Sequence, residues 1–311
     1  MTACHDAPVE RTGVTVAVVG TLNLDHTARV ARLPRTGEGV VGEVVAIGPG
    51  GKGANQAAAA ARLGCQVSLV GKVGNDEQGA LLRADLASAG VGVQGVAMSK
   101  RPTGVAVIMV ADRGENSICV ASGANGDLSP EDIDGVADWS GPTLVSLEVP
   151  IATAIYALKK SQGMRILNPA PARDVPVELL ASAYLITPNE TEAEELTGIR
   201  PTDEAACHKC ARALMELGPA AVCITLGERG SFLMCNDKAT LLEPHRVQAV
   251  DSTGAGDAFN GALVSFLNEG RGLENACRLA NVVGALATTR PGARGGLPSI
   301  EAVRAAAGDL F

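Results

Sequence analysis

Short apolar runs alternate with helical patterns along most of the chain, and a polar or glycine-rich segment follows most of these runs. The first run, at residues 14–19, is rich in valine and uncharged, which is typical of a strand buried on both faces of a parallel sheet. Further strands are expected at residues 67–70, 91–97, 143–147, 164–167, 184–187 and 221–226. Because the carboxyl ends of parallel strands lie at one edge of a sheet, the polar segments should meet there. The pattern therefore predicts an α/β fold with a ligand site at that edge.

Two stretches depart from this alternation. Residues 26–47 form short alternating segments broken by proline and glycine. Residues 103–110 and 116–121 form a hairpin-like pair around the turn Asp112-Arg113-Gly114. We expect these stretches to form one small β-sheet, which would act as a lid that keeps water away from the site.

The domain organisation follows from these patterns, since no repeat or low-complexity segment interrupts the chain. Residues 14–311 are expected to form one α/β domain, with the lid segments inserted at about residues 24–49 and 100–122. Residues 1–13 are expected to be a flexible extension.

Composition and charge limit the range of partners. The chain has 311 residues and a formal net charge of −8, and it has no run of five basic residues, which argues against a nucleic-acid partner. No stretch reaches the roughly 18 uncharged apolar residues that a membrane span requires, and the N-terminus lacks the apolar region of a secretion signal. We therefore expect a cytoplasmic protein with small-molecule partners.

The eight cysteines are scattered through apolar segments of a chain too large to need covalent crosslinks, and we expect them to be reduced. Cys207 and Cys210 form a Cys-x-x-Cys pair in a helical pattern, but a second pair at zinc-finger spacing is missing. A metal or redox role for these cysteines is therefore not expected.

A glycine-rich loop, Asp251-Ser-Thr-Gly-Ala-Gly-Asp257, leads into the helical pattern at residues 258–267. Gly254 and Gly256 permit unusual backbone conformations, and N–H groups at a helix N-terminus attract anions. Asp257 would repel a phosphate unless it faces another group, such as a hydroxyl that it deprotonates. The alternative is that Asp257 merely interacts with the positive end of the helix dipole.

A second glycine-rich loop occupies residues 48–55. Gly48, Gly50 and Gly53 match the dinucleotide pattern G-x-G-x-x-G. That reading is disfavoured because the preceding segment is short and half-polar and Pro49 interrupts the turn. A Walker A loop is excluded because Lys52 is followed by glycine. The loop is therefore expected to present backbone amides and the side chains of Lys52 and Asn55 to a polar ligand.

Four motifs taken together resemble those of the ribokinase-like carbohydrate kinases. They are Gly-Gly-Lys-Gly-Ala-Asn at 50–55, Asn-Pro-Ala-Pro at 168–171, Thr-Pro-Asn-Glu-Thr-Glu-Ala-Glu at 187–194 and the loop at 251–257. The resemblance runs from about Val14 to the C-terminus, with the motifs in the expected order. It implies a three-layer α/β sandwich with a mostly parallel central sheet and a small β-sheet lid. It also implies ATP-dependent phosphorylation of a sugar, with Mg2+ and K+ as cofactors and a homodimer formed through the lid.

The resemblance also implies roles for individual residues. Asp257 is similar to the general base of the family, and the amides of Gly254, Ala255 and Gly256 to its anion hole. The implied sugar site comprises Asn23, Asp25, Gly51, Lys52, Asn55, Glu148 and Asp257. The implied nucleotide site comprises Asn189, Thr225, Gly227, Gly230, Gly256 and Asn281. Glu192 matches the magnesium and phosphate motif, and the implied monovalent-cation loop comprises Asp251, Thr253, Ala287, Arg290 and Gly292.

Two positions depart from the family pattern. Asn281 stands where a histidine is common in bacterial members, and the last cation ligand, commonly a serine, falls near Gly296. Ser299 is the nearest serine, and that ligand stays unassigned.

The first 138 residues, which include most of the implied sugar site and the whole lid, contain no Phe, Tyr or Trp. A purine would lack an aromatic stacking partner there, and stacking is worth about 1–3 kcal/mol per base. A free pentose is therefore preferred, with ribose first and deoxyribose, fructose or a nucleoside as alternatives. A non-catalytic sugar-binding or sensory protein and a dinucleotide oxidoreductase are the alternatives from other classes.

Overall fold

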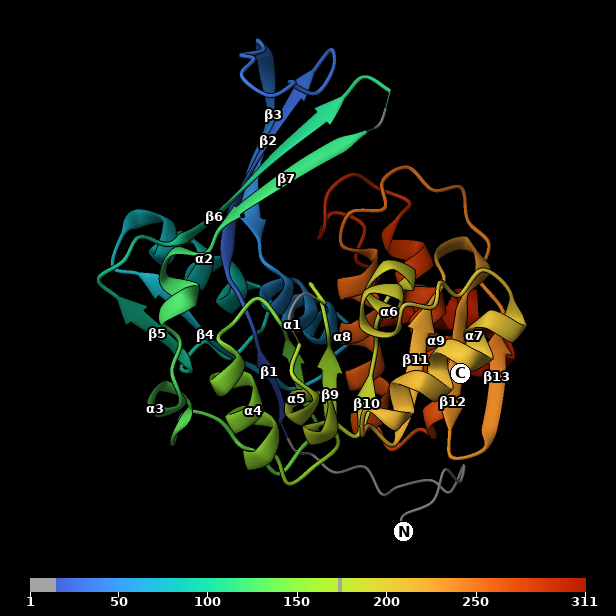
Figure 1. The fold of residues 1–311 in the computed structure, drawn as a ribbon. Coiled ribbons are helices and arrows are strands. Elements are labelled where there is room, and N and C mark those ends of the chain that lie inside the picture. The colour runs from blue at the N-terminus through green and yellow to red at the C-terminus, as the bar shows by residue number, and fades with distance from the viewer. Residues whose placement is uncertain (1–14, 114, 173–174) are drawn as a thin grey trace.

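The computed structural model describes residues 15–113, 115–172 and 175–311, so the extension expected at residues 1–13 lies outside the described residues. The described chain contains a nine-stranded sheet of order β13-β12-β11-β10-β9-β8-β1-β4-β5 (Figure 1). The parallel strands are β1 (Val16–Val19), β4 (Val67–Gly74), β5 (Val96–Ser99), β8 (Thr143–Ser146), β9 (Arg165–Asn168), β10 (Leu185–Ile186) and β11 (Ala221–Thr225). The hairpin β12 (Ser231–Cys235) and β13 (Lys238–Leu242) adds two antiparallel strands at one edge. The predicted mostly parallel sheet is thus confirmed.

Helices cover both faces of this sheet. One face carries α1 (Lys52–Arg62), α2 (Glu77–Ser88), α8 (Ala255–Asn268), α9 (Leu273–Ala287) and α10 (Ile300–Ala307). The other face carries α3 (Pro130–Ile133), α4 (Ile151–Lys160), α5 (Val177–Ser182), α6 (Glu190–Thr197) and α7 (Glu204–Glu216). Val16 and Val18 of β1 belong to the first core, and Ala17 and Val19 to the second, because side chains alternate along a strand. The expected three-layer sandwich is therefore confirmed.

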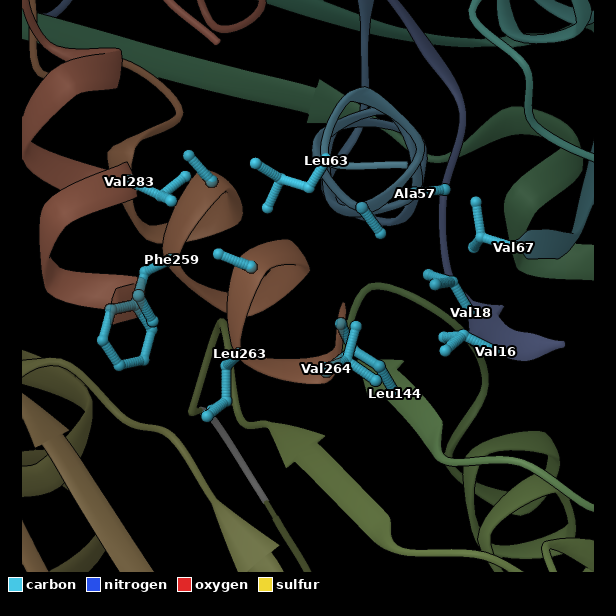
Figure 2. Packing of buried hydrophobic residues seen from close by; sticks show 14 of the residues in the cluster. Val16, Val18, Ala57, Leu63, Val67, Leu144, Phe259, Leu263, Val264 and Val283 are labelled. Carbon is cyan, nitrogen blue, oxygen red and sulfur yellow. The ribbon is translucent and has the colours of Figure 1, made fainter. Parts of the chain in front are cut away.

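The core between the sheet and α8 determines where the site forms. Figure 2 shows Phe259 and Leu263 of α8 packed among the buried side chains of this layer. Burying a side chain of that size contributes about 1.5–3 kcal/mol. The helices α1 and α8 approach closely at Gly261, where a Cβ atom would lie only 2.4 Å from the carbonyl oxygen of Gln56. This packing places the N-terminal turns of α1 and α8 beside each other.

The remaining strands form a four-stranded sheet of order β3-β2-β6-β7 in the described chain, and it projects from the body (Figure 1). Its strands are β2 (Asn23–Val30), β3 (Gly42–Gly50), β6 (Gly104–Ala111) and β7 (Asn116–Ala121). The expectation that residues 26–47 and 103–121 form one small sheet is confirmed, although β2 and β6 pair in parallel. We call this element the small sheet.

Side chains at the base of the small sheet fix it to the body. Asn125, in the 3-10 turn Gly123–Asp127, donates to the carbonyl oxygen of Leu22 and to Oδ1 of Asn23 and accepts from the amide of Leu22. Asp76, the N-cap of α2, accepts from the backbone amide and hydroxyl of Thr103 just before β6. The small sheet therefore begins at fixed points, although its outer part extends away from the core.

Several predicted boundaries are wrong. The strand expected at 91–97 is observed at residues 96–99, and the strand expected at 184–187 contains only Leu185 and Ile186. The sequence patterns also did not predict the hairpin of β12 and β13. No helix in the described part of the chain is long and apolar enough to cross a membrane.

The cysteines largely follow expectation. Cys65, Cys119, Cys207, Cys210, Cys223 and Cys277 are free thiols. The expectation of reduced cysteines is wrong for Cys235, which is disulfide-bonded, and Cys4 lies outside the described residues. Cys207 and Cys210 are buried in α7, where they belong to the core.

Candidate active site

The loop at 251–257 forms a sharp turn into α8. Gly254 is the N-cap of this helix and has a left-handed backbone conformation, with φ of 76°. A Cβ atom at this position would lie 2.8 Å from Cα of Ala293, so both the conformation and the space require glycine. The helix dipole at this N-terminus favours an anion, but the backbone N–H of Ala255, one of the three amides assigned to the anion hole, already donates to the carbonyl oxygen of Ser252 at 3.2 Å.

Asp257 lies in the first turn of α8, but its carboxylate faces α1. Oδ2 accepts a hydrogen bond from Nδ2 of Asn55 at 3.0 Å, and Oδ1 accepts one from Nε2 of Gln56 at 3.2 Å. Burial raises the pKa of Asp257, and the charge of Lys52 and the two amide hydrogen bonds oppose that rise. These contacts do not fit a carboxylate that serves only its own helix terminus. They fit a carboxylate that is held in place with a higher proton affinity.

The residues assigned to the sugar converge beside Asp257. Asp25 lies on β2, Gly51 and Lys52 lie at the start of α1, and Glu148 follows β8 and accepts a hydrogen bond from the hydroxyl of Thr21 at 2.6 Å. Burial, reinforced by the charge of Glu148, raises the pKa of Asp25 to about 6. The remaining member, Asn23, is buried and accepts from Asn125.

Lys52 is the cation at the centre of this group. Burial lowers the pKa of Lys52, but the charges of nearby carboxylates outweigh that effect and leave the pKa above its usual value. These carboxylates are Asp257, Glu148, Glu192 and Asp25. The ammonium group of Lys52 thus stays protonated under the influence of four carboxylates.

A cavity of about 1010 Å³ opens on the other side of the loop. All six residues assigned to the nucleotide line it, namely Asn189, Thr225, Gly227, Gly230, Gly256 and Asn281. Thr225 and Asn189 lie side by side because the amide of Thr225 donates to the carbonyl oxygen of Pro188. The cavity is large enough for a nucleotide, and its residues lie next to the anion-binding turn of α8.

Some of these cavity side chains already have structural partners. The side chain of Asn189 accepts from the amide of Glu192 at the start of α6. Nδ2 of Asn281 donates weakly to the carbonyl oxygens of Leu242 and Glu243, both at 3.4 Å. Their nucleotide contacts stay predictions.

Glu192 is the residue assigned to magnesium. Its Oε2 accepts from the amide of Asn189 at 2.9 Å, and burial raises the pKa of Glu192 to about 6. No cluster of three or more His, Cys, Asp or Glu side chains suited to a metal occurs within residues 15–113, 115–172 and 175–311. One carboxylate beside an anion site fits Mg2+ that is held mainly by phosphate oxygens and water.

The residues assigned to a monovalent cation lie in two loops that are tied together. Asp251 accepts from the amide of Thr253 at 2.9 Å and from the amide of Gly292 at 2.8 Å. Ala287 ends α9, and Arg290 is exposed in the loop that follows. Since both carboxylate oxygens of Asp251 accept backbone amides, a cation here would be held mainly by carbonyl oxygens.

The structure explains the departure at position 296. A Cβ atom on Gly296 would lie 1.9 Å from the carbonyl oxygen of Ala287, so this backbone arrangement leaves no room for a side chain. Ser299 is the N-cap of α10, where its side chain accepts from the amide of Ala302. Neither position offers a free hydroxyl toward the loop.

Sequence reasoning missed several residues of the site. Gln56 links Asp257 to Asn168, since its amide nitrogen donates to both, and Arg294 donates from Nε to Oδ1 of Asn55 at 2.9 Å. Gln56 directly follows a predicted ligand and could have been suspected on that ground. The position of Arg294 depends on how the loop at 289–296 folds back, which no local pattern indicates.

The pattern G-x-G-x-x-G at residues 48–53 spans the end of β3 and the start of α1. Because β3 belongs to the small sheet and not to the parallel sheet, the pattern does not form a dinucleotide-binding βαβ unit. The structure thus agrees with the rejection of that reading.

Comparison with known proteins gives consistent matches. The family model described as pfkB family carbohydrate kinase matches residues 15–300. A ribokinase of Haemophilus influenzae is 38% identical over 292 residues, covering 92% of this chain and 95% of that protein. A deoxyribokinase of Salmonella typhimurium is 36% identical over 296 residues, covering 92% and 96%. The structure of Arabidopsis thaliana ribokinase complexed with ribose and ATP has a TM-score of 0.86 and 31% identity, and the match covers 95% of this chain and 99% of that one.

Proposed function

Because the chain belongs to the pfkB family of carbohydrate kinases, we propose that it transfers the γ-phosphoryl group of ATP to the 5-hydroxyl of D-ribose. The products are ribose 5-phosphate and ADP. The resemblance inferred from four sequence motifs is confirmed, and the chain is a carbohydrate kinase that uses ATP. Membership of this family argues against the two alternatives from other classes, a dinucleotide oxidoreductase and a non-catalytic sugar-binding or sensory protein.

The observation that carries the proposal is the position of Asp257. Its carboxylate lies between the sugar-side residues Asn55 and Lys52 and the turn that borders the nucleotide cavity. In this position it takes the proton from the 5-hydroxyl as the oxygen attacks the γ-phosphorus atom. A positioned base contributes on the order of 10²- to 10⁴-fold to the rate.

The neighbouring groups stabilise charge on the transferring phosphoryl group. The amides of Gly254 and Gly256 donate to its oxygens, and that of Ala255 joins them once it leaves the carbonyl oxygen of Ser252. The ammonium group of Lys52 lies among the carboxylates around the transfer point. Mg2+, near Glu192, would neutralise charge on the β- and γ-phosphates when bound. A potassium ion in the loops of Asp251 and Gly292 would add positive charge beside the anion-binding turn.

The small sheet serves in this proposal as the lid over the sugar and as the contact between two copies of the chain in a cytoplasmic homodimer. Its strands carry large exposed apolar side chains, which are Val44, Val45, Ile47, Val107, Ile118 and Val120. Such a surface is costly to leave in water and is typical of an interaction site. Light scattering that gives the mass of a single chain at micromolar concentration would contradict the dimer.

The experiment that tests the function is a coupled assay of ADP release by the purified protein with ATP, Mg2+ and K+. We expect ADP release that depends on ribose, with a product phosphorylated at the 5-hydroxyl as shown by NMR. A protein that is inactive with ribose but active with adenosine or fructose would contradict the substrate assignment.

Deoxyribose is the second candidate, because the relatives include a deoxyribokinase at 36% identity, close to the 38% of the ribokinase. The two sugars differ by the 2-hydroxyl, so kcat/KM for each sugar in the same assay decides between them. We expect ribose to be preferred because an unpaired buried polar group penalises the sugar that lacks its partner.

A further inference from the structure

Arg294 is an almost buried cation next to the sugar-side residues. Only 15% of its side chain is exposed, although it belongs to the loop that connects α9 to α10. The preceding residue, Ala293, packs against Gly254 of the anion-binding turn, which brings the loop over the site. A buried guanidinium group is costly unless each of its N–H groups has a partner.

Two of the three guanidinium nitrogens have such partners. Nη1 pairs with the carboxylate of Asp85 on α2, and Nε donates to Oδ1 of Asn55. Nδ2 of Asn55 in turn donates to Asp257. Arg294 therefore fixes which way the amide of Asn55 points, because Oδ1 must face the guanidinium group and Nδ2 must face the carboxylate.

The third nitrogen has no partner. Nη2 of Arg294 is buried and makes no hydrogen bond with the described residues, and the same holds for Oδ1 of Asp25. The charge of Asp25 acts on Arg294, as does the charge of Asp257, so all three groups share one small region. An unused donor and an unused acceptor in that region suit a group that can both donate and accept, such as a sugar hydroxyl.

We propose that Arg294 is a sugar-binding and specificity-determining residue, whose Nη2 donates to a sugar hydroxyl that donates in turn to Oδ1 of Asp25. This inference rests on the proposed sugar kinase function, and it adds a contact from the C-terminal loop. The pair with Asp85 holds the guanidinium group at the correct position, so Asp85 acts as a positioning residue.

The test is a cycle of enzyme variants and sugar variants. Arg294→Gln removes the charge and shortens the side chain, Asp85→Asn weakens the support of the guanidinium group, and Arg278→Gln is the control. Arg278 pairs with Glu274 on α9, away from these groups. KM and kcat are measured for ribose and for analogues that each lack one hydroxyl, and ribose binding is measured separately by calorimetry without ATP.

We expect Arg294→Gln to raise KM for ribose about 10- to 100-fold, with a smaller effect on kcat and no effect on KM for ATP. For one deoxy analogue the variant and the wild type should differ much less, because that sugar lacks the hydroxyl that Arg294 binds. Asp85→Asn should show the same pattern more weakly, and Arg278→Gln should match the wild type.

An equal loss of kcat/KM for ribose and for every deoxy analogue would overturn the proposal and leave Arg294 a structural role. Unchanged ribose affinity in calorimetry would overturn it as well. The activity of the wild-type protein tests the ribose assignment separately from the role of Arg294. If it phosphorylates another sugar and not ribose, the ribose assignment fails, and the same cycle is run with analogues of the sugar that it uses.

Discussion

The sugar side and the nucleotide side of the candidate site differ in the kinds of residues that form them. The sugar side consists of charged and amide side chains: Asn55 bonds to Asp257 and to Arg294, and the charges of Asp25 and Lys52 act on each other and on Asp257. The nucleotide side is an open cavity of about 1010 Å³, whose lining combines small residues such as Gly227, Gly230 and Ala285 with charged ones such as Glu228 and Arg229. A linked network of side chains discriminates strongly, because one missing partner leaves a buried polar group unpaired. An open cavity whose side chains are not linked in such a network tolerates substitution better.

The largest effect is expected at the boundary between the two sides. Replacing Asp257 by Asn keeps the size of the side chain but removes the base, so kcat should fall by at least about 10²-fold while ribose affinity is retained. Rapid-quench measurement of phosphoryl transfer, combined with calorimetry of ribose binding, checks this expectation. If kcat were unchanged, Asp257 could not be the base.

A smaller effect, and one that depends on pH, is expected on the sugar side. In Asp25→Asn we expect KM for ribose to rise about 10- to 100-fold, because a charge-assisted hydrogen bond is lost. The variant should nevertheless be more stable at pH 7.5. Burial raises the pKa of Asp25 from 3.8 to about 6. Above pH 6 the folded protein therefore contains an ionised carboxylate whose charge is disfavoured by burial, and this lowers its stability.

The pH dependence of this stability difference follows from the raised pKa of Asp25. The cost is fully present above about pH 6, decreases as pH falls, and disappears below 3.8, where Asp25 is protonated in both the folded and the unfolded state. At about 1.4 kcal/mol per pKa unit, the variant should gain up to about 3 kcal/mol at pH 7.5. Denaturant unfolding of both proteins at pH 7.5 and pH 4 measures the difference, and a gain that is larger at pH 4 would contradict the sign.

The smallest effect is expected in the nucleotide cavity. Asn281→His introduces the residue that is common in bacterial members of the family and loses only two long hydrogen bonds of 3.4 Å. We expect KM for ATP to change less than about threefold and KM for ribose to stay the same. Initial rates at varied ATP concentrations test this, and a tenfold change would show that this wall discriminates as strongly as the sugar side.

The sequence allowed the layered fold to be predicted because that fold depends on local periodicity. The run at residues 14–19 and the later strands are apolar in a way that only a sheet covered on both faces accommodates. The end of the predicted strand at 91–97 could not be located, since its pairing with β4 is decided by tertiary contacts. The ends of a strand depend on the neighbouring strands with which it pairs, and a local sequence pattern does not identify those neighbours.

The same distinction applies to the site. Residues in short motifs, such as Lys52, Asn55 and Asp257, could be named because the motif carries its own backbone geometry. Arg294 could not be named, because it reaches Asn55 across 239 positions of sequence through a loop without periodicity. The motifs of this chain thus name candidate groups for the reaction centre, but they do not name the groups that hold those candidates in place.

The bond between Asn55 and Asp257 joins residues that are 202 positions apart. In a growing polypeptide, Asp25, Lys52 and Glu148 are therefore synthesised long before Asp257 and Arg294. Until the last fifth of the protein has been synthesised and has docked, the carboxylate that we propose as the base is absent, and the proposed reaction cannot take place. We therefore expect activity to appear in one late step of folding, when α8 and the loop of Arg294 pack against Asn55.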